Sequence, residues 1–183
     1  MNFRVWLYIA AGLFAAGLLL GTVLPADAVA EELTVFDNLA EEVSSMSGIE
    51  IFFFILIRNV TAFLTAFFFS PLLLLVPIGS LLLNGAFITI VSRLVLEERS
   101  IGFLIAGIMP HGIIEIPAFI FALAASLSFG FAVLRGLFKS GYRDRVAPEL
   151  KANLRRLGLA LLLLIPAALI ESFITPVFIG FFN

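Results

Sequence analysis

Long apolar stretches, separated by short charged ones, form the dominant pattern along this chain. Five runs contain at most two charged residues each: residues 5–24, 49–70, 72–91, 101–134 and 157–182. A helix needs about 20 predominantly apolar residues to cross a bilayer, so each run is long enough to cross once. The pattern predicts an all-α polytopic membrane protein, with five spans in a single transmembrane domain over residues 1–183.

The run 101–134 is too long for one straight span. At about 1.5 Å per residue, a helix through it would extend roughly 50 Å, against a hydrocarbon core of about 30 Å. Pro110 lacks a backbone donor and Gly112 permits backbone angles that other residues resist, so both favour a break. We therefore expect a short re-entrant or interfacial helix over 101–109, followed by a spanning helix over 110–134.

Composition supports a membrane protein. Hydrophobic residues make up 62% of the chain, charged residues make up 13%, and the mean hydropathy is +1.16, which exceeds what the core of a soluble domain needs. The chain has no cysteine. A disulfide, a thiolate metal site and a cysteine nucleophile are therefore excluded.

The first run is expected to be a retained anchor, because it exceeds the usual signal-peptide length of about 7 to 15 apolar residues. Its small residues suit close contact between helices, and one expectation is a homodimer through such faces. These residues are Gly12, Ala15, Ala16, Gly17 and Gly21.

Charges outside the runs are segregated. Residues 25–50 include seven acids and no base, whereas residues 135–156 include seven bases and two acids. Because bases accumulate in cytoplasmic loops, we expect 135–156 to be a basic cytoplasmic loop and 25–50 an acidic extracytoplasmic loop with an amphipathic helix. Five crossings then place the N-terminus in the cytoplasm and the C-terminus outside. Topology explains the bases better than an anionic-lipid site does, and nothing beyond charge supports nucleic-acid binding.

Six polar or charged residues lie inside the apolar runs. Such residues are rare within membranes and usually face one another or water. We expect them to form a buried polar centre in which Arg58 pairs with Glu115 or Glu171, while the other side chains complete a hydrogen-bond network. The six residues are Arg58, Asn59, Asn84, His111, Glu115 and Glu171.

Three functions are compatible with such a centre. In the favoured one, it holds the helices of a scaffold or assembly protein in register, with lipid and other membrane proteins or a second copy as partners. Alternatively, His111 and Glu115 form the proton or ion site of a small transporter or channel. In a third interpretation, His111, Glu115 and Glu171 bind a divalent metal in an intramembrane hydrolase, although zinc sites generally use more histidine or cysteine. No Gly-x-Ser-x-Gly motif points to a serine hydrolase.

The segment 110–118, Pro-His-Gly-Ile-Ile-Glu-Ile-Pro-Ala, resembles the signature of the stage II sporulation protein M family of integral membrane proteins. The segments 58–59 (Arg-Asn), 84–85 (Asn-Gly) and 171–176 (Glu-Ser-Phe-Ile-Thr-Pro) resemble further motifs of that family, in the expected order. The resemblance implies a membrane scaffold that assembles with a cell-wall-degrading hydrolase and a partner membrane protein. Any wall chemistry would then belong to the partner. The resemblance also marks five residues as motif residues without assigning their roles: Asn59, Asn84, His111, Glu115 and Glu171.

Overall fold

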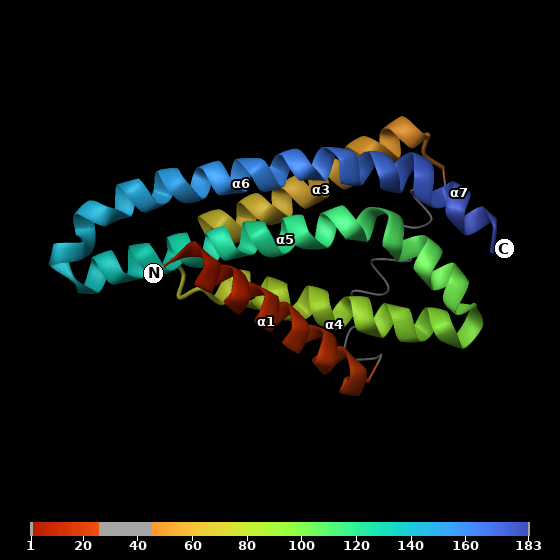
Figure 1. Ribbon diagram of the computed structural model, residues 1–183, viewed down its shortest axis with the longest axis horizontal. Helices are drawn as coiled ribbons and strands as arrows, with labels where there is room; N and C mark the ends of the chain where they lie inside the picture. The colour runs from red at the N-terminus through yellow and green to blue at the C-terminus, as the bar shows by residue number, and fades with distance from the viewer. Residues whose placement is uncertain (1, 26–44, 183) are drawn as a thin grey trace.

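The computed structural model describes residues 2–25 and 45–182, and every regular element within them is helical (Figure 1). Five helices in this part of the chain are long and apolar enough to cross a membrane, with the region Ser140–Gly180 counted as one. The predicted all-α membrane bundle is thereby confirmed. The α-helices are α1 (Phe3–Val23), α3 (Gly48–Phe68), α4 (Leu75–Glu98), α5 (Ile101–Phe138), α6 (Val146–Leu169) and α7 (Thr175–Gly180).

Helix α5 lies in the middle of the bundle and packs against α1, α3, α4 and α6 (Figure 1). The small residues Ala118, Ala122 and Ala124 at its centre are completely buried, and small side chains allow neighbouring helices to approach closely. Next to them, the ring of Phe129 stacks on that of Phe67 from α3, with 4.9 Å between the centroids. The core is therefore built around α5.

Helices α1 and α4 touch backbone to backbone. A Cβ atom at Gly17 would lie 2.4 Å from the carbonyl oxygen of Leu82, and one at Gly85 would lie 2.5 Å from that of Phe14. Because a backbone atom cannot move aside as a flexible side chain can, both positions need glycine. Gly17 and Gly21 of α1 thus serve a helix contact within the chain, whereas Gly12 and Ala15 are exposed.

Arg93 of α4 completes this contact at the C-terminal end of α1. Its Nη1 donates to the carbonyl oxygens of Gly21, Thr22 and Leu24 at 3.1, 3.3 and 3.0 Å. The last carbonyls of a helix have no partner within it, and a cation also interacts favourably with this end of the helix dipole. Arg93 therefore caps α1 from a neighbouring helix.

The expected break at Pro110 is a bend within one helix. Helix α5 continues from Ile101 to Phe138 with Pro110 and Pro117 inside it, and Figure 1 shows its first part turned sharply away from the rest. A proline inside a helix removes one hydrogen bond and clashes with the preceding turn, which kinks the helix without ending it when neighbouring segments hold both parts. The part that qualifies as a span begins at Gly112.

The segment 135–156, predicted to be a basic cytoplasmic loop, is itself largely helical. Helix α5 extends to Phe138, a 3₁₀ turn covers Ser140–Arg145, and α6 begins at Val146. Charged residues end the apolar run in this segment, but a helix can continue beyond its apolar part when one of its faces remains packed against the bundle. A π turn, Ile170–Ile174, then joins α6 to α7.

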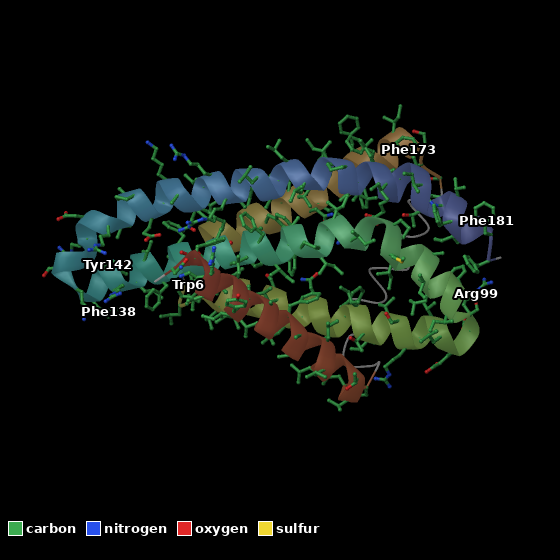
Figure 2. The ribbon with its side chains drawn as sticks, viewed as in Figure 1. Trp6, Arg99, Phe138, Tyr142, Phe173 and Phe181 are labelled. Atoms are coloured by element: carbon green, nitrogen blue, oxygen red, sulfur yellow. The ribbon has the colours of Figure 1, made fainter. Side chains whose placement is uncertain are left out.

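The basic segment 135–156 marks one end of the bundle. Phe138 and Tyr142 lie at this basic end, where α5 meets α6, and Arg99 and Phe181 lie at the opposite end (Figure 2). Phe3 at the start of α1 lies beside the last residue of the basic segment, because the guanidinium carbon of Arg156 is 3.9 Å from its ring centroid. The start of α1 therefore lies in the same half of the bundle as the basic segment (Figure 1). The predicted amphipathic helix of the acidic segment falls within 26–44, outside the described residues.

Candidate functional site

A hydrogen bond joins two of the predicted polar residues across the bundle. Nδ2 of Asn59, near the middle of α3, donates to Oε1 of Glu115 on α5 at 3.1 Å. Both side chains are partly buried. The bond lies within the apolar part of both helices, where a polar group without a partner is strongly unfavourable.

Glu171 lies at the same place, on a π turn of the last span. The π turn packs against both α3 and α5, the helices that carry Asn59 and Glu115. Directly after the turn, Thr175 Oγ1 donates back to the carbonyl oxygen of Ile170 at 3.3 Å. Such turns are rare and occur frequently at functional sites.

Pro176 gives a local reason for the irregular backbone at Glu171. A proline lacks the N–H that would bond to the carbonyl four residues earlier, which belongs to Ser172. The helix adjusts around this position through the π turn and resumes as α7. We refer to Asn59, Glu115 and Glu171 together as the carboxylate cluster.

His111 lies on α5, one helical turn before Glu115, as its four-residue spacing predicts. Its side chain lies outside the described part of the structure. Among the side chains that are described, no three of His, Asp or Glu form a group that could hold a metal ion. The metal set of His111, Glu115 and Glu171 therefore stays a prediction.

Arg58 does not join the carboxylate cluster. Its side chain is exposed on the outer face of α3, with the guanidinium 5.7 Å from the ring centroid of Phe54 on the same helix. Within the described residues it forms no ion pair, so the expected pairing with Glu115 or Glu171 is absent there. Adjacent positions on a helix point about 100° apart, and Asn59 is the one that faces α5.

Asn84 also lies away from the cluster. It is exposed on α4, and its Nδ2 donates to the carbonyl oxygen of Ser80 on the same helix at 2.8 Å. The adjacent Gly85 is buried against α1. Of the six predicted residues, the structure therefore brings together Asn59, Glu115 and Glu171 and places Arg58 and Asn84 on the outside.

Comparison with known protein families matches residues 10–176 to one family, described as stage II sporulation protein M. This match covers most of the chain and includes all six residues singled out from the sequence. The chain belongs to the stage II sporulation protein M family. No curated protein and no solved structure matches it. Family membership and the five spanning helices together make it a multi-pass membrane protein.

A second polar cluster, around Asn153, was not predicted from the sequence. Asn153 of α6 is completely buried, and its Nδ2 donates to the carbonyl oxygen of Glu149 at 2.9 Å and to Oγ of Ser128 on α5 at 3.3 Å. Nη1 of Arg156 donates to Oδ1 of Asn153 at 2.7 Å. These bonds satisfy the amide inside the bundle.

A helical period in the sequence could have revealed Asn153. It shares the buried face of α6 with Leu157, Ala160 and Leu164, at steps of three and four residues. This repeat begins upstream of the apolar run. A search for periodicity, in place of mean hydropathy, would therefore have extended the helix into the basic segment.

Proposed function

We propose that this chain is an integral membrane scaffold or assembly protein of the stage II sporulation protein M type, which binds at least one other membrane protein. The supporting observation is the outer face of α3, where Arg58, Thr61 and Thr65 are exposed at the level of the apolar helix. Polar residues at membrane depth normally face protein or water. Such a face is suited to binding another transmembrane segment.

The carboxylate cluster has a structural role in this proposal. Its hydrogen bond ties α3 to α5, and Glu171 brings the last span to the same point. Because lipid tails are as apolar as leucine, polar contacts help to set the rotation and register of membrane helices. The cluster keeps α3 in the orientation that turns Arg58 outward.

Assembly can be tested in membranes of the source cell. The chain, tagged at its chromosomal locus, is extracted in mild detergent, its particle mass is measured, and co-purifying proteins are quantified against the chain. We expect a particle heavier than a monomer or dimer, with another membrane protein at a fixed ratio. A particle that contains only this chain would contradict the proposal.

A proton or ion site is the second candidate function, and it rests on the two neighbouring carboxyl groups. A carboxyl group in the apolar interior of a bundle can take up a proton or a cation, because neutralisation removes the cost of burying its charge. For this function, Glu115→Gln would abolish proton or cation flux into liposomes while leaving the protein folded. For the scaffold, purified protein would produce no flux with or without the substitution.

A further inference from the structure

The outer face of α3 contains three polar side chains whose hydrogen-bonding capacity is unused. Arg58, Thr61 and Thr65 are exposed at steps of three and four residues, with the small Ala62 between them. Within residues 2–25 and 45–182, neither threonine hydroxyl forms a hydrogen bond, and the Arg58 guanidinium has no hydrogen-bond or ion-pair partner, lying 5.7 Å from the ring centroid of Phe54. We call this stripe the Arg58 face.

Four other hydroxyl groups in the spans are satisfied locally. Thr89, Ser92, Ser126 and Ser172 each donate to the carbonyl oxygen four residues earlier, at 3.3, 2.6, 2.9 and 2.7 Å. This bond is the usual way in which a helix in lipid accommodates a hydroxyl. The threonines of the Arg58 face depart from that pattern, which leaves their hydroxyls available to a neighbouring segment.

Lipid alone does not accommodate Arg58. It is the eleventh of the 21 residues of α3, so roughly 15 Å of helix separates it from either end. Long basic side chains reach the headgroups when they lie near helix ends. Arg58 lies at the middle, where a charged group needs a protein partner or water.

A second copy of this chain does not fit the Arg58 face. Two copies with the same membrane orientation, related by a two-fold axis, would bring Arg58 next to its own copy, and like charges in contact are unfavourable. The acids of the described chain outside the interior cluster lie near helix ends: Glu50, Glu97, Glu98, Asp144 and the half-buried Glu149. Glu115 and Glu171 belong to the interior cluster. No described acid is therefore placed to meet Arg58 from a second copy.

We propose that the Arg58 face binds a transmembrane helix of another protein that bears a carboxylate at mid-membrane depth. The carboxylate pairs with the Arg58 guanidinium, Ala62 allows the helix backbones to approach, and the two threonines hydrogen-bond to the partner. This inference rests on the proposed assembly function and specifies the chemistry of its partner.

A synthetic helix tests this chemistry without knowledge of the natural partner. The full chain, labelled with an acceptor dye at an introduced Gly141→Cys, is reconstituted into phosphatidylcholine liposomes with donor-labelled leucine-alanine transmembrane peptides. The peptides have glutamate, glutamine or leucine at their central position. We expect energy transfer to give an association constant about fivefold or more higher for the glutamate peptide than for the leucine peptide, the factor for one interhelical polar contact.

Variants of the chain then assign the effect to Arg58. Arg58→Gln should lower the association constant of the glutamate peptide to that of the glutamine peptide. Arg58→Lys keeps the positive charge and should therefore retain most of the higher association constant of the glutamate peptide. Arg58→Glu should reverse the preference, so that a peptide with a central arginine binds best. Arg99→Gln, which removes an exposed arginine at a helix end, is the matched control and should change nothing.

Three results would overturn the inference. These are equal association of all three peptides, a glutamate excess that survives Arg58→Gln, and Arg58-dependent energy transfer between copies of the chain itself. None depends on the particle isolated from native membranes. If the native particle contained only this chain, the proposed function would be contradicted even if the glutamate peptide bound. If the native particle contained another protein but the peptide did not bind, only the inference about the Arg58 face would be contradicted.

Discussion

Nδ2 of Asn59 lies 3.1 Å from Oε1 of Glu115 and joins two helices whose residues are 56 positions apart in the chain. If this bond orients α3, substitutions at its two ends should not be additive. We expect a double-mutant cycle of Asn59→Ala and Glu115→Ala to give a coupling of about 0.6 kcal/mol, and at most about 1.7 kcal/mol, the values for interhelical hydrogen bonds in membranes. Reversible unfolding in bicelles measures each free energy.

Asn84→Ala is the matched control for that cycle. The amide of Asn84 bonds to the carbonyl of Ser80 on its own helix, so its substitution should be additive with Glu115→Ala to within about 0.5 kcal/mol. Equal coupling of both asparagines to Glu115 would contradict a specific bond between Asn59 and Glu115.

The contact between α1 and α4 should not tolerate a side chain at Gly85. A Cβ there would lie 2.5 Å from the carbonyl oxygen of Phe14 and 2.8 Å from the amide nitrogen of Leu18, so the helices would have to separate. We expect Gly85→Ala to lower the free energy of unfolding by about 1 to 3 kcal/mol, the range for overpacking. Gly12→Ala is the control, because nothing lies within 4 Å of its added Cβ and alanine favours a helix. Similar losses for both variants would show that the contact is looser than described.

Removal of the Arg93 cap should loosen the end of α1. Arg93→Gln loses three hydrogen bonds to the carbonyls of Gly21, Thr22 and Leu24. Because the guanidinium is exposed and water can replace part of the interaction, we expect a loss of only about 1 kcal/mol. Hydrogen exchange should accelerate over the last turn of α1. Arg99→Gln should leave that turn unchanged.

The absence of cysteine in the sequence makes topology directly measurable. Gly141→Cys lies in the exposed turn at the basic end, and Glu98→Cys lies exposed at the opposite end, close to Arg99 (Figure 2). With the basic end in the cytoplasm, a membrane-impermeant maleimide should label Glu98→Cys in intact cells and Gly141→Cys only after permeabilisation. The reverse labelling would invert the predicted orientation, and labelling of both sites from outside would contradict it.

Metal analysis separates the scaffold from an ion-dependent site. We expect purified protein, assayed by plasma mass spectrometry, to hold no stoichiometric metal that disappears in the double variant His111→Ala, Glu115→Gln. Two neighbouring carboxyl groups can attract a cation, so a metal lost in that variant would contradict the expectation. Hydrolysis and transport assays would then become the next measurements.

Arg58 and Asn59 show why the sequence predicted the members of the polar centre only in part. The sequence places both in the middle of a span, and membrane energetics requires each to find a polar environment. It does not say which of two adjacent residues, about 100° apart around the helix, faces the interior. Packing of α3 against α5 decides this, and it turns Arg58 outward.

Pro110 and Asn153 illustrate two further limits. A proline has the same local effect whether the chain breaks or bends, and the packing of α5 against its neighbours makes it a bend. Asn153 lies in a segment whose charges suggested a loop, yet its hydrogen bond to Ser128 depends on a helix contact between residues 25 positions apart. Neither outcome follows from local composition.

The sequence by itself determined the class of protein, the spanning segments, and the few residues that hydrocarbon would reject, because the length and apolarity of a run decide whether it can cross a bilayer. The nine residues from Pro110 to Ala118 also pointed to the family that the comparison establishes. Only the tertiary structure decided how each helix is rotated about its axis and which polar side chains meet. Those outcomes depend on close contacts between distant residues, such as Gly17 with Leu82 and Asn59 with Glu115.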